Sequence, residues 1–78
     1  MKKTYLLIWF NSEGMMPSMI NDRLLNIGFK PENGYYDYVY EWDEHVTTED
    51  ILKIGDKIKD MLQGSNVLFK LESTSTND

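Results

Sequence analysis

Residues 35–42, with the sequence YYDYVYEW, decide the fold because their side chains alternate in character. Successive side chains of a β-strand point to opposite faces of the sheet. One face of this strand is fully aromatic and consists of Tyr36, Tyr38, Tyr40 and Trp42. The other face contains the carboxylates of Asp37 and Glu41, whose burial without a partner is strongly unfavourable. We therefore expect helices to cover the aromatic face and the charged face to stay open.

A second predicted strand, residues 4–10 (TYLLIWF), is apolar on both faces. Such a strand is typical of the middle of a sheet that is covered on both sides. A chain of 78 residues has little material for two covering layers, which indicates a partner. The period alone does not say which row faces the core. Because Tyr5 and Trp9 are amphipathic, we favour Tyr5, Leu7 and Trp9 as the outward row and Leu6, Ile8 and Phe10 as the core row.

Two segments have the apolar spacing of helices. The first starts at Pro17, which is tolerated in a first turn, and stops before Gly28, which suits a left-handed C-terminal position. It predicts a helix over residues 17–27. The second starts with a capping box from Thr47 to Asp50 and predicts a helix over residues 48–63. Gly55 shares its apolar stripe, which we interpret as close packing of this helix.

Two further strands complete the pattern. Residues 29–32 form a short piece that Pro31 confines to a sheet edge, and Asn33-Gly34 predicts a tight hairpin into residues 35–42. Residues 67–72 alternate, with Val67, Phe69 and Leu71 on the inward face. We expect a single domain over residues 1–73 and a disordered polar tail over residues 74–78.

The resulting order is β-α-β-β-α-β. It predicts a ferredoxin-like α+β sandwich, with two helices on one face of a four-stranded antiparallel sheet in the order 4-1-3-2. The main alternative is a three-stranded β-α-β-α-β sheet in which residues 29–32 are a loop.

The composition excludes several classes of function. The chain has no cysteine, so disulfides, thiolate metal sites and cysteine nucleophiles are excluded, and a cytoplasmic location is favoured. The net charge of −5 repels phosphate backbones, so we expect no nucleic-acid partner. The apolar run after Lys3 is short for a signal peptide, and no stretch approaches the about 18 apolar residues of a membrane span, so we expect no membrane partner.

The open face of the predicted sheet is the candidate interaction surface. It combines the outward row of the first strand with one residue from each of two neighbouring strands: Tyr5, Leu7, Trp9, Val39 and Leu68. Apolar stripes on an uncovered face usually mark association with a protein.

Four polar loop residues are weaker candidates for chemistry: Glu13, Asp43, Glu44 and His45. These residue types can hold a hard cation or form a His–carboxylate site, but solvated acids near helix starts are far commoner. The single histidine has no nearby serine or cysteine to activate as a nucleophile. We therefore expect no catalytic residues, no metal and no cofactor.

A broader likeness follows from the Ser12-Glu13-Gly14 loop, Pro17-Ser18, the Gly28-Phe29 pair, residues 36–42 and residues 68–72 (LFKLE). With these features the chain resembles small conserved-hypothetical prokaryotic proteins of ferredoxin-like type. The resemblance supports the fold and implies no activity. The functional expectation is a small interaction or accessory domain, associating with itself or with another protein through the open face. The alternative is a small-molecule-sensing or catalytic domain whose site forms at a subunit interface.

Overall fold

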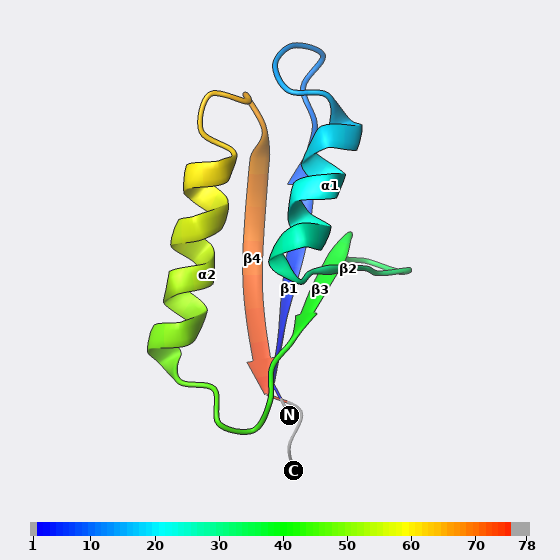
Figure 1. Cartoon of the computed structure of the whole chain (residues 1–78). Helices are drawn as coiled ribbons and strands as arrows, with labels where there is room; N and C mark the ends of the chain where they lie inside the picture. Colours follow the sequence, from blue (N-terminus) through cyan, green and yellow to red (C-terminus); the bar gives the residue numbers. More distant parts are fainter. Residues whose placement is uncertain (1, 76–78) are drawn as a thin grey trace.

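The computed structural model describes residues 2–75 and shows an α+β fold with two helices and a four-stranded sheet (Figure 1). The elements follow one another as β1 (Lys2–Trp9), α1 (Pro17–Ile27), β2 (Lys30–Pro31), β3 (Tyr38–Glu41), α2 (Thr48–Met61) and β4 (Leu68–Ser75).

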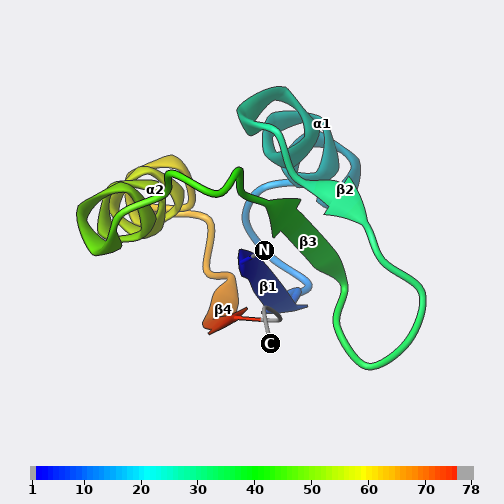
Figure 2. The same cartoon turned by 90° about the horizontal axis from the view of Figure 1, so that it is seen from below.

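All paired strands of the sheet are antiparallel, and their order is β2-β3-β1-β4. This is the predicted order 4-1-3-2 read from the opposite edge. The three-stranded alternative is wrong, because Lys30 of β2 pairs with Val39 of β3. Both helices lie on the same face of the sheet, α2 over β4 and α1 over the β3–β2 side (Figure 2). Within residues 2–75 no element covers the opposite face.

The core lies between the sheet and the helices. Leu6 and Ile8 of β1 face it, as predicted, together with residues of α1, β3, α2 and the segments next to them: Ile20, Leu24, Phe29, Tyr38, Ile54, Ile58 and Leu62. The predicted core position of Phe10 is wrong. Because β1 ends at Trp9, Phe10 lies in the following loop and is 47% exposed.

The helix ends follow the local sequence signals. Gly28 has a φ of 125°, and the N–H groups of Gly28 and Phe29 donate to the carbonyls of Leu25 and Leu24, which is a Schellman arrangement. At the start of α2, the Asp50 N–H donates to the Thr47 hydroxyl and the Thr47 N–H donates to the Asp50 carboxylate, at 3.1 and 3.0 Å. The capping box is therefore confirmed, although α2 ends at Met61 and not at residue 63.

The hairpin between β2 and β3 differs from the prediction. β3 begins at Tyr38, so Asn33 and Gly34 lie in a wider loop that closes where the Glu32 N–H donates to the Asp37 carbonyl at 2.9 Å. The loop extends away from the sheet (Figure 2). The predicted core orientation of Tyr36 is also wrong, because this side chain lies on the open face and stacks on Tyr5.

β4 extends further than the sequence pattern indicates. It continues through Ser75, and Ser73 and Thr74 pair with Thr4 and Lys3 of β1. Hydroxyls of Thr4 and Ser73 are hydrogen-bonded at 2.8 Å. The predicted disordered tail is therefore wrong at residues 74 and 75, because β1 begins early enough to pair with them. Residues 76–78 of that tail lie outside the described residues.

Candidate interaction surface

The open face brings together all five residues of the predicted interaction surface. β1 and β4 pair so that Tyr5 lies opposite Glu72, and Trp9 opposite Leu68. On the other side of β1, Tyr5 lies opposite Val39 of β3. Paired residues share a face of the sheet, so one surface contains Tyr5, Leu7, Trp9, Val39 and Leu68.

Exposure divides this surface into two ends. At the end where β1 stops, Trp9 is 52% exposed and its cross-strand neighbour Leu68 is 71% exposed, with Leu7 half-buried beside them. We call Leu7, Trp9 and Leu68 the apolar end. At the other end, Val39 is buried, which differs from its predicted exposure. Of the two ends, the apolar end therefore exposes the larger apolar surface to solvent.

The buried end is covered by a side chain that the sequence period assigned to the core. The rings of Tyr36 and Tyr5 stack with centroids 4.5 Å apart and planes inclined by 22°. The Tyr36 hydroxyl also donates to the Glu72 carboxylate, across the width of β1. That bond raises the pKa of Tyr36 to about 12 and lowers the pKa of Glu72. No local sequence signal identifies this contact, since its partners are far apart in the chain.

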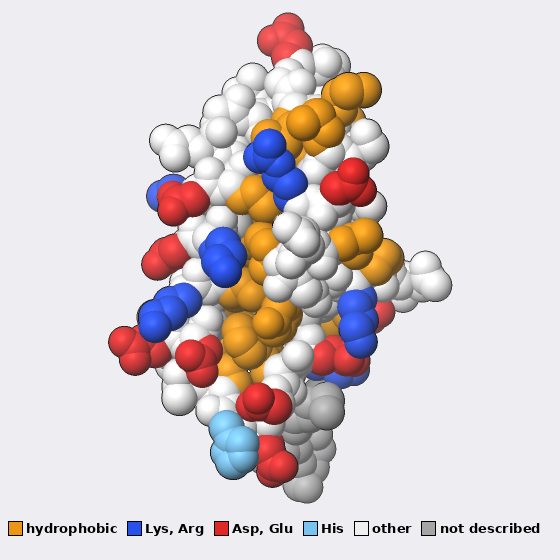
Figure 3. Space-filling model, in the orientation of Figure 1, with side chains coloured by type: hydrophobic (Ala, Val, Ile, Leu, Met, Phe, Trp, Pro, Cys, Tyr) orange, Lys and Arg blue, Asp and Glu red, His pale blue; other side chains and the backbone are white. Residues whose placement is uncertain are grey.

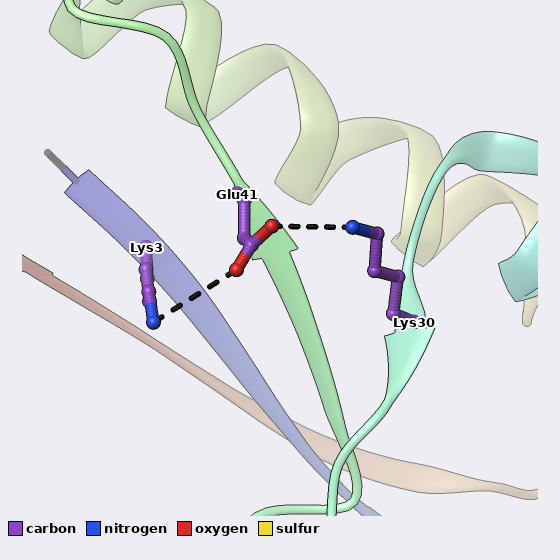
Figure 4. Close-up of polar contacts among 3 residues, drawn as sticks. All are labelled: Lys3, Lys30 and Glu41. Atoms are coloured by element: carbon purple, nitrogen blue, oxygen red, sulfur yellow. Dashed lines mark hydrogen bonds and ion pairs between the residues drawn. The ribbon is translucent and has the colours of Figure 1, made fainter.

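Charged side chains border the buried end. The Glu41 carboxylate lies 3.2 Å from the Lys30 ammonium and 3.9 Å from the Lys3 ammonium (Figure 4). The three residues come from β3, β2 and β1 and so connect three strands. Because these groups are well exposed, each pair contributes little to stability. A third ion pair on this face joins Lys70 and Glu72, at 3.5 Å.

Asp37 has a structural role beyond the solvated charge that the sequence predicts. The Ile8 N–H donates to the Asp37 carboxylate at 2.9 Å, at the level where β3 no longer pairs with β1. The side chain therefore satisfies a backbone donor that the sheet leaves without a strand partner.

The four loop candidates do not form one site. Glu13 lies in the β1–α1 loop, whereas Asp43, Glu44 and His45 lie in the β3–α2 loop at the opposite end of the molecule (Figure 1). The Asp43 carboxylate accepts a hydrogen bond from the His45 N–H at 2.8 Å, which is a local turn contact. Among the residues that the structure describes, no group of three or more His, Cys, Asp or Glu could hold a metal ion.

A shallow groove lies on the helix side of the molecule. Hydrophobic side chains gather along the line between α1 and α2 (Figure 3). A cavity of about 220 Å³ there has apolar walls and charged groups at α2: Ile27, Tyr40, Trp42, Ile54, Asp50, Lys53 and Lys57. The Trp42 ring is held in place because its N–H donates to the Thr4 hydroxyl at 2.8 Å. The apolar walls of the groove are thus side chains that pack against the core, and its charged groups lie on α2.

Neither described helix combines the length and the apolar character needed to cross a bilayer. Comparison of the chain with family models, curated proteins and solved structures found no match.

Proposed function

We propose that this protein is a small association domain of ferredoxin-like fold, which binds a protein surface through the apolar end of its open face. The occupant is a second copy of the chain or another protein. One observation carries the proposal: Trp9 and Leu68 form an exposed cross-strand pair on a sheet face that no described element covers.

The physical basis is the apolar area that Trp9 and Leu68 leave in contact with water. Burial of apolar surface stabilises a complex by roughly 25 cal/mol per Å² before the costs of association are subtracted. A tryptophan at the centre of a patch is a typical anchor of protein interfaces, and polar groups usually form the rim. Lys70, which pairs with Leu7 across the strands, supplies such a rim group.

The two ends of the open face differ in whether an aromatic ring of the same chain stacks on them, and this difference supports the apolar end as the binding surface. Tyr36 stacks on Tyr5 at the end that also contains Val39, and in residues 2–75 no comparable ring is stacked on Trp9. The chain thus covers the half of its open face that its own loop reaches, and leaves the other half to a partner.

The test compares Trp9→Glu and Leu68→Glu with Leu25→Glu, a control at an exposed leucine of α1. Sedimentation equilibrium measures self-association, and affinity capture followed by titration with each purified candidate measures binding of another protein. We expect both open-face variants to weaken binding at least about tenfold and the control to have no effect. The proposal fails if folded open-face variants bind as tightly as the unmodified chain in both assays.

A further inference from the structure

β4 forms a long outer edge of the sheet. It has eight residues, contains neither proline nor glycine, and among residues 2–75 pairs on one side only, with β1. The opposite edge is different, because β2 has two residues and one of them is Pro31. Proteins usually protect edge strands by shortening them, by proline, by bulges or by charged side chains, since an open edge offers backbone groups to another strand. β4 has none of the first three protections, and its two charged side chains, Lys70 and Glu72, have opposite signs.

The hydrogen-bond pattern identifies the backbone groups at this edge. The carbonyls of Lys2 and Leu6 accept from Trp42 and Asp37, so the even-numbered residues of β1 direct their backbone groups toward β3. In an antiparallel ladder the alternate residues then bond to the other neighbour, β4. Their partners in β4 are Leu68, Lys70, Glu72 and Thr74. The N–H and C=O groups of Phe69, Leu71 and Ser73 therefore point away from β1, toward the outer edge.

The charges of β4 favour one register for pairing with a second copy of itself. Two such strands can form hydrogen bonds only if the residues whose N–H and C=O groups point toward the outer edge lie opposite one another. An antiparallel pair with Leu71 on the two-fold axis satisfies this condition. In that register Lys70 lies opposite a second copy's Glu72, and the reverse pair forms symmetrically. The next allowed registers place Lys70 opposite Lys70 or Glu72 opposite Glu72, which is unfavourable. The strand is thus self-complementary in charge about Leu71.

Gly55 provides a second, independent observation at the same level of the molecule. It lies inside α2, where glycine lowers helix stability relative to alanine. A Cβ atom added at Gly55 would meet only the Leu71 side chain, at 3.5 Å, which is ordinary contact. The single chain therefore does not need a glycine here, and the close packing that the sequence indicated is not a tight contact within the monomer.

The position of Gly55 on α2 would allow a second α2 helix to approach closely. Residues advance by about 100° around a helix, and Lys53 and Lys57 line the groove toward α1, so Gly55 lies on the flank turned away from α1. Two β4 strands paired edge to edge would be about 4.8 Å apart, whereas packed helices usually need about 8–10 Å between axes. Because α2 lies over β4 (Figure 2), two α2 helices would cross closely, and a residue without a side chain at the crossing allows that approach.

We propose that the chain forms a two-fold homodimer by antiparallel pairing of its β4 edges. Leu71 lies on the axis, Lys70 and Glu72 form reciprocal ion pairs, and the two α2 helices cross at Gly55. The product is a continuous eight-stranded sheet with four helices on one face. This inference goes beyond the proposed function because it uses the backbone edge of β4 and not the apolar end; Lys70 borders both, and the dimer keeps both apolar ends available.

The experiment measures the dimer dissociation constant by sedimentation equilibrium. All charge variants, and the reference protein to which they are compared, contain Tyr36→Phe. The hydrogen bond from Tyr36 to Glu72 is then absent from every protein in the comparison, so its loss does not affect the differences between them. Lys70→Glu should weaken the dimer about tenfold or more, because like charges then face each other. The double variant Lys70→Glu/Glu72→Lys should restore the dimer, because the opposite pairs re-form with their signs exchanged.

Gly55→Ala gives a signature that a purely structural role would not. The added methyl group should weaken the dimer, while the monomer retains its fold and gains resistance to urea. Trp9→Glu should leave the dimer intact, which separates this inference from the proposed function. A chain that stays monomeric at high concentration overturns the inference. So does a dimer that is sensitive to Trp9→Glu but indifferent to Lys70→Glu and Gly55→Ala.

Discussion

Tyr36 stacks on Tyr5 and donates its hydroxyl to Glu72, so a residue of the β2–β3 loop reaches across the central strand to the edge strand. The contact connects three parts of the chain on the open face and leaves the end with Trp9 exposed. It also makes the stability of the fold depend on pH in two ranges.

The first prediction concerns alkaline pH. The bond to Glu72 raises the pKa of Tyr36 from 10.0 to about 12. Below about pH 10 the Tyr36 hydroxyl is protonated in both the folded and the unfolded chain, so its bond to Glu72 contributes fully to the free energy of unfolding. Between about pH 10 and 12 the unfolded chain loses this proton first, so stability falls as the pH rises. Urea unfolding at pH 9 and pH 11 measures the free energy of unfolding. This free energy should fall more between the two pH values for the unmodified protein than for Tyr36→Phe. Equal losses would mean that the bond does not form in solution.

Acid should destabilise the fold through two carboxylates. The pKa of Glu72 is lowered by the Tyr36 hydroxyl, and that of Asp50 by the N–H of Thr47. A carboxylate whose pKa is lowered by folding stabilises the fold at pH values above its pKa in the unfolded chain, which is about 4.5 for glutamate. This stabilisation is lost as the pH falls through the lower pKa that the group has in the folded chain. The difference in unfolding free energy between pH 6 and pH 3 should therefore shrink in Glu72→Gln and in Asp50→Asn. An unchanged difference in both variants contradicts the assignment.

The aromatic face of β3 should be essential to the core. Tyr38 is 7% exposed, and its hydroxyl donates to the Asn21 side chain at 2.6 Å. Replacing it by alanine should cost about 3–5 kcal/mol, which is a large part of the stability of a domain of this size. Phe69→Ala should cost less, because Phe69 is half-buried. Thermal and urea unfolding measure both effects, and a Tyr38→Ala protein as stable as the original would refute this view of the core.

Gly55→Ala should stabilise the isolated monomer by about 0.5–1 kcal/mol, because alanine is the better helix former and its methyl group has room beside Leu71. Urea unfolding at dilutions where the chain is monomeric measures this gain. Gly64→Ala is the matched control. A Cβ atom added at Gly64 would meet nothing within 4 Å, but its φ of 80° is strained for alanine, so that variant should lose stability. Destabilisation by Gly55→Ala would show that the helix needs its glycine for packing within one chain.

The features that the sequence predicted correctly depend on neighbouring residues. The capping box at Thr47, the glycine stop after Ile27 and the inward row of Leu6 and Ile8 each follow from groups a few positions apart. The strand order also followed, since the alternation of apolar side chains and the sequence of elements allow few arrangements. For the same reason, the five residues of the candidate surface were assigned to one face of the sheet.

What only the tertiary structure decided depends on contacts between distant residues. Tyr36 and Glu72 are 36 positions apart, and their bond takes Tyr36 out of the alternation that its neighbours obey. The length of β4 depends on where β1 begins, and the exposure of Phe10 depends on where β1 ends. Val39 has the period of an open-face residue but is buried on that face. A local pattern gives the direction of a side chain, whereas its burial depends on which distant segment packs over it.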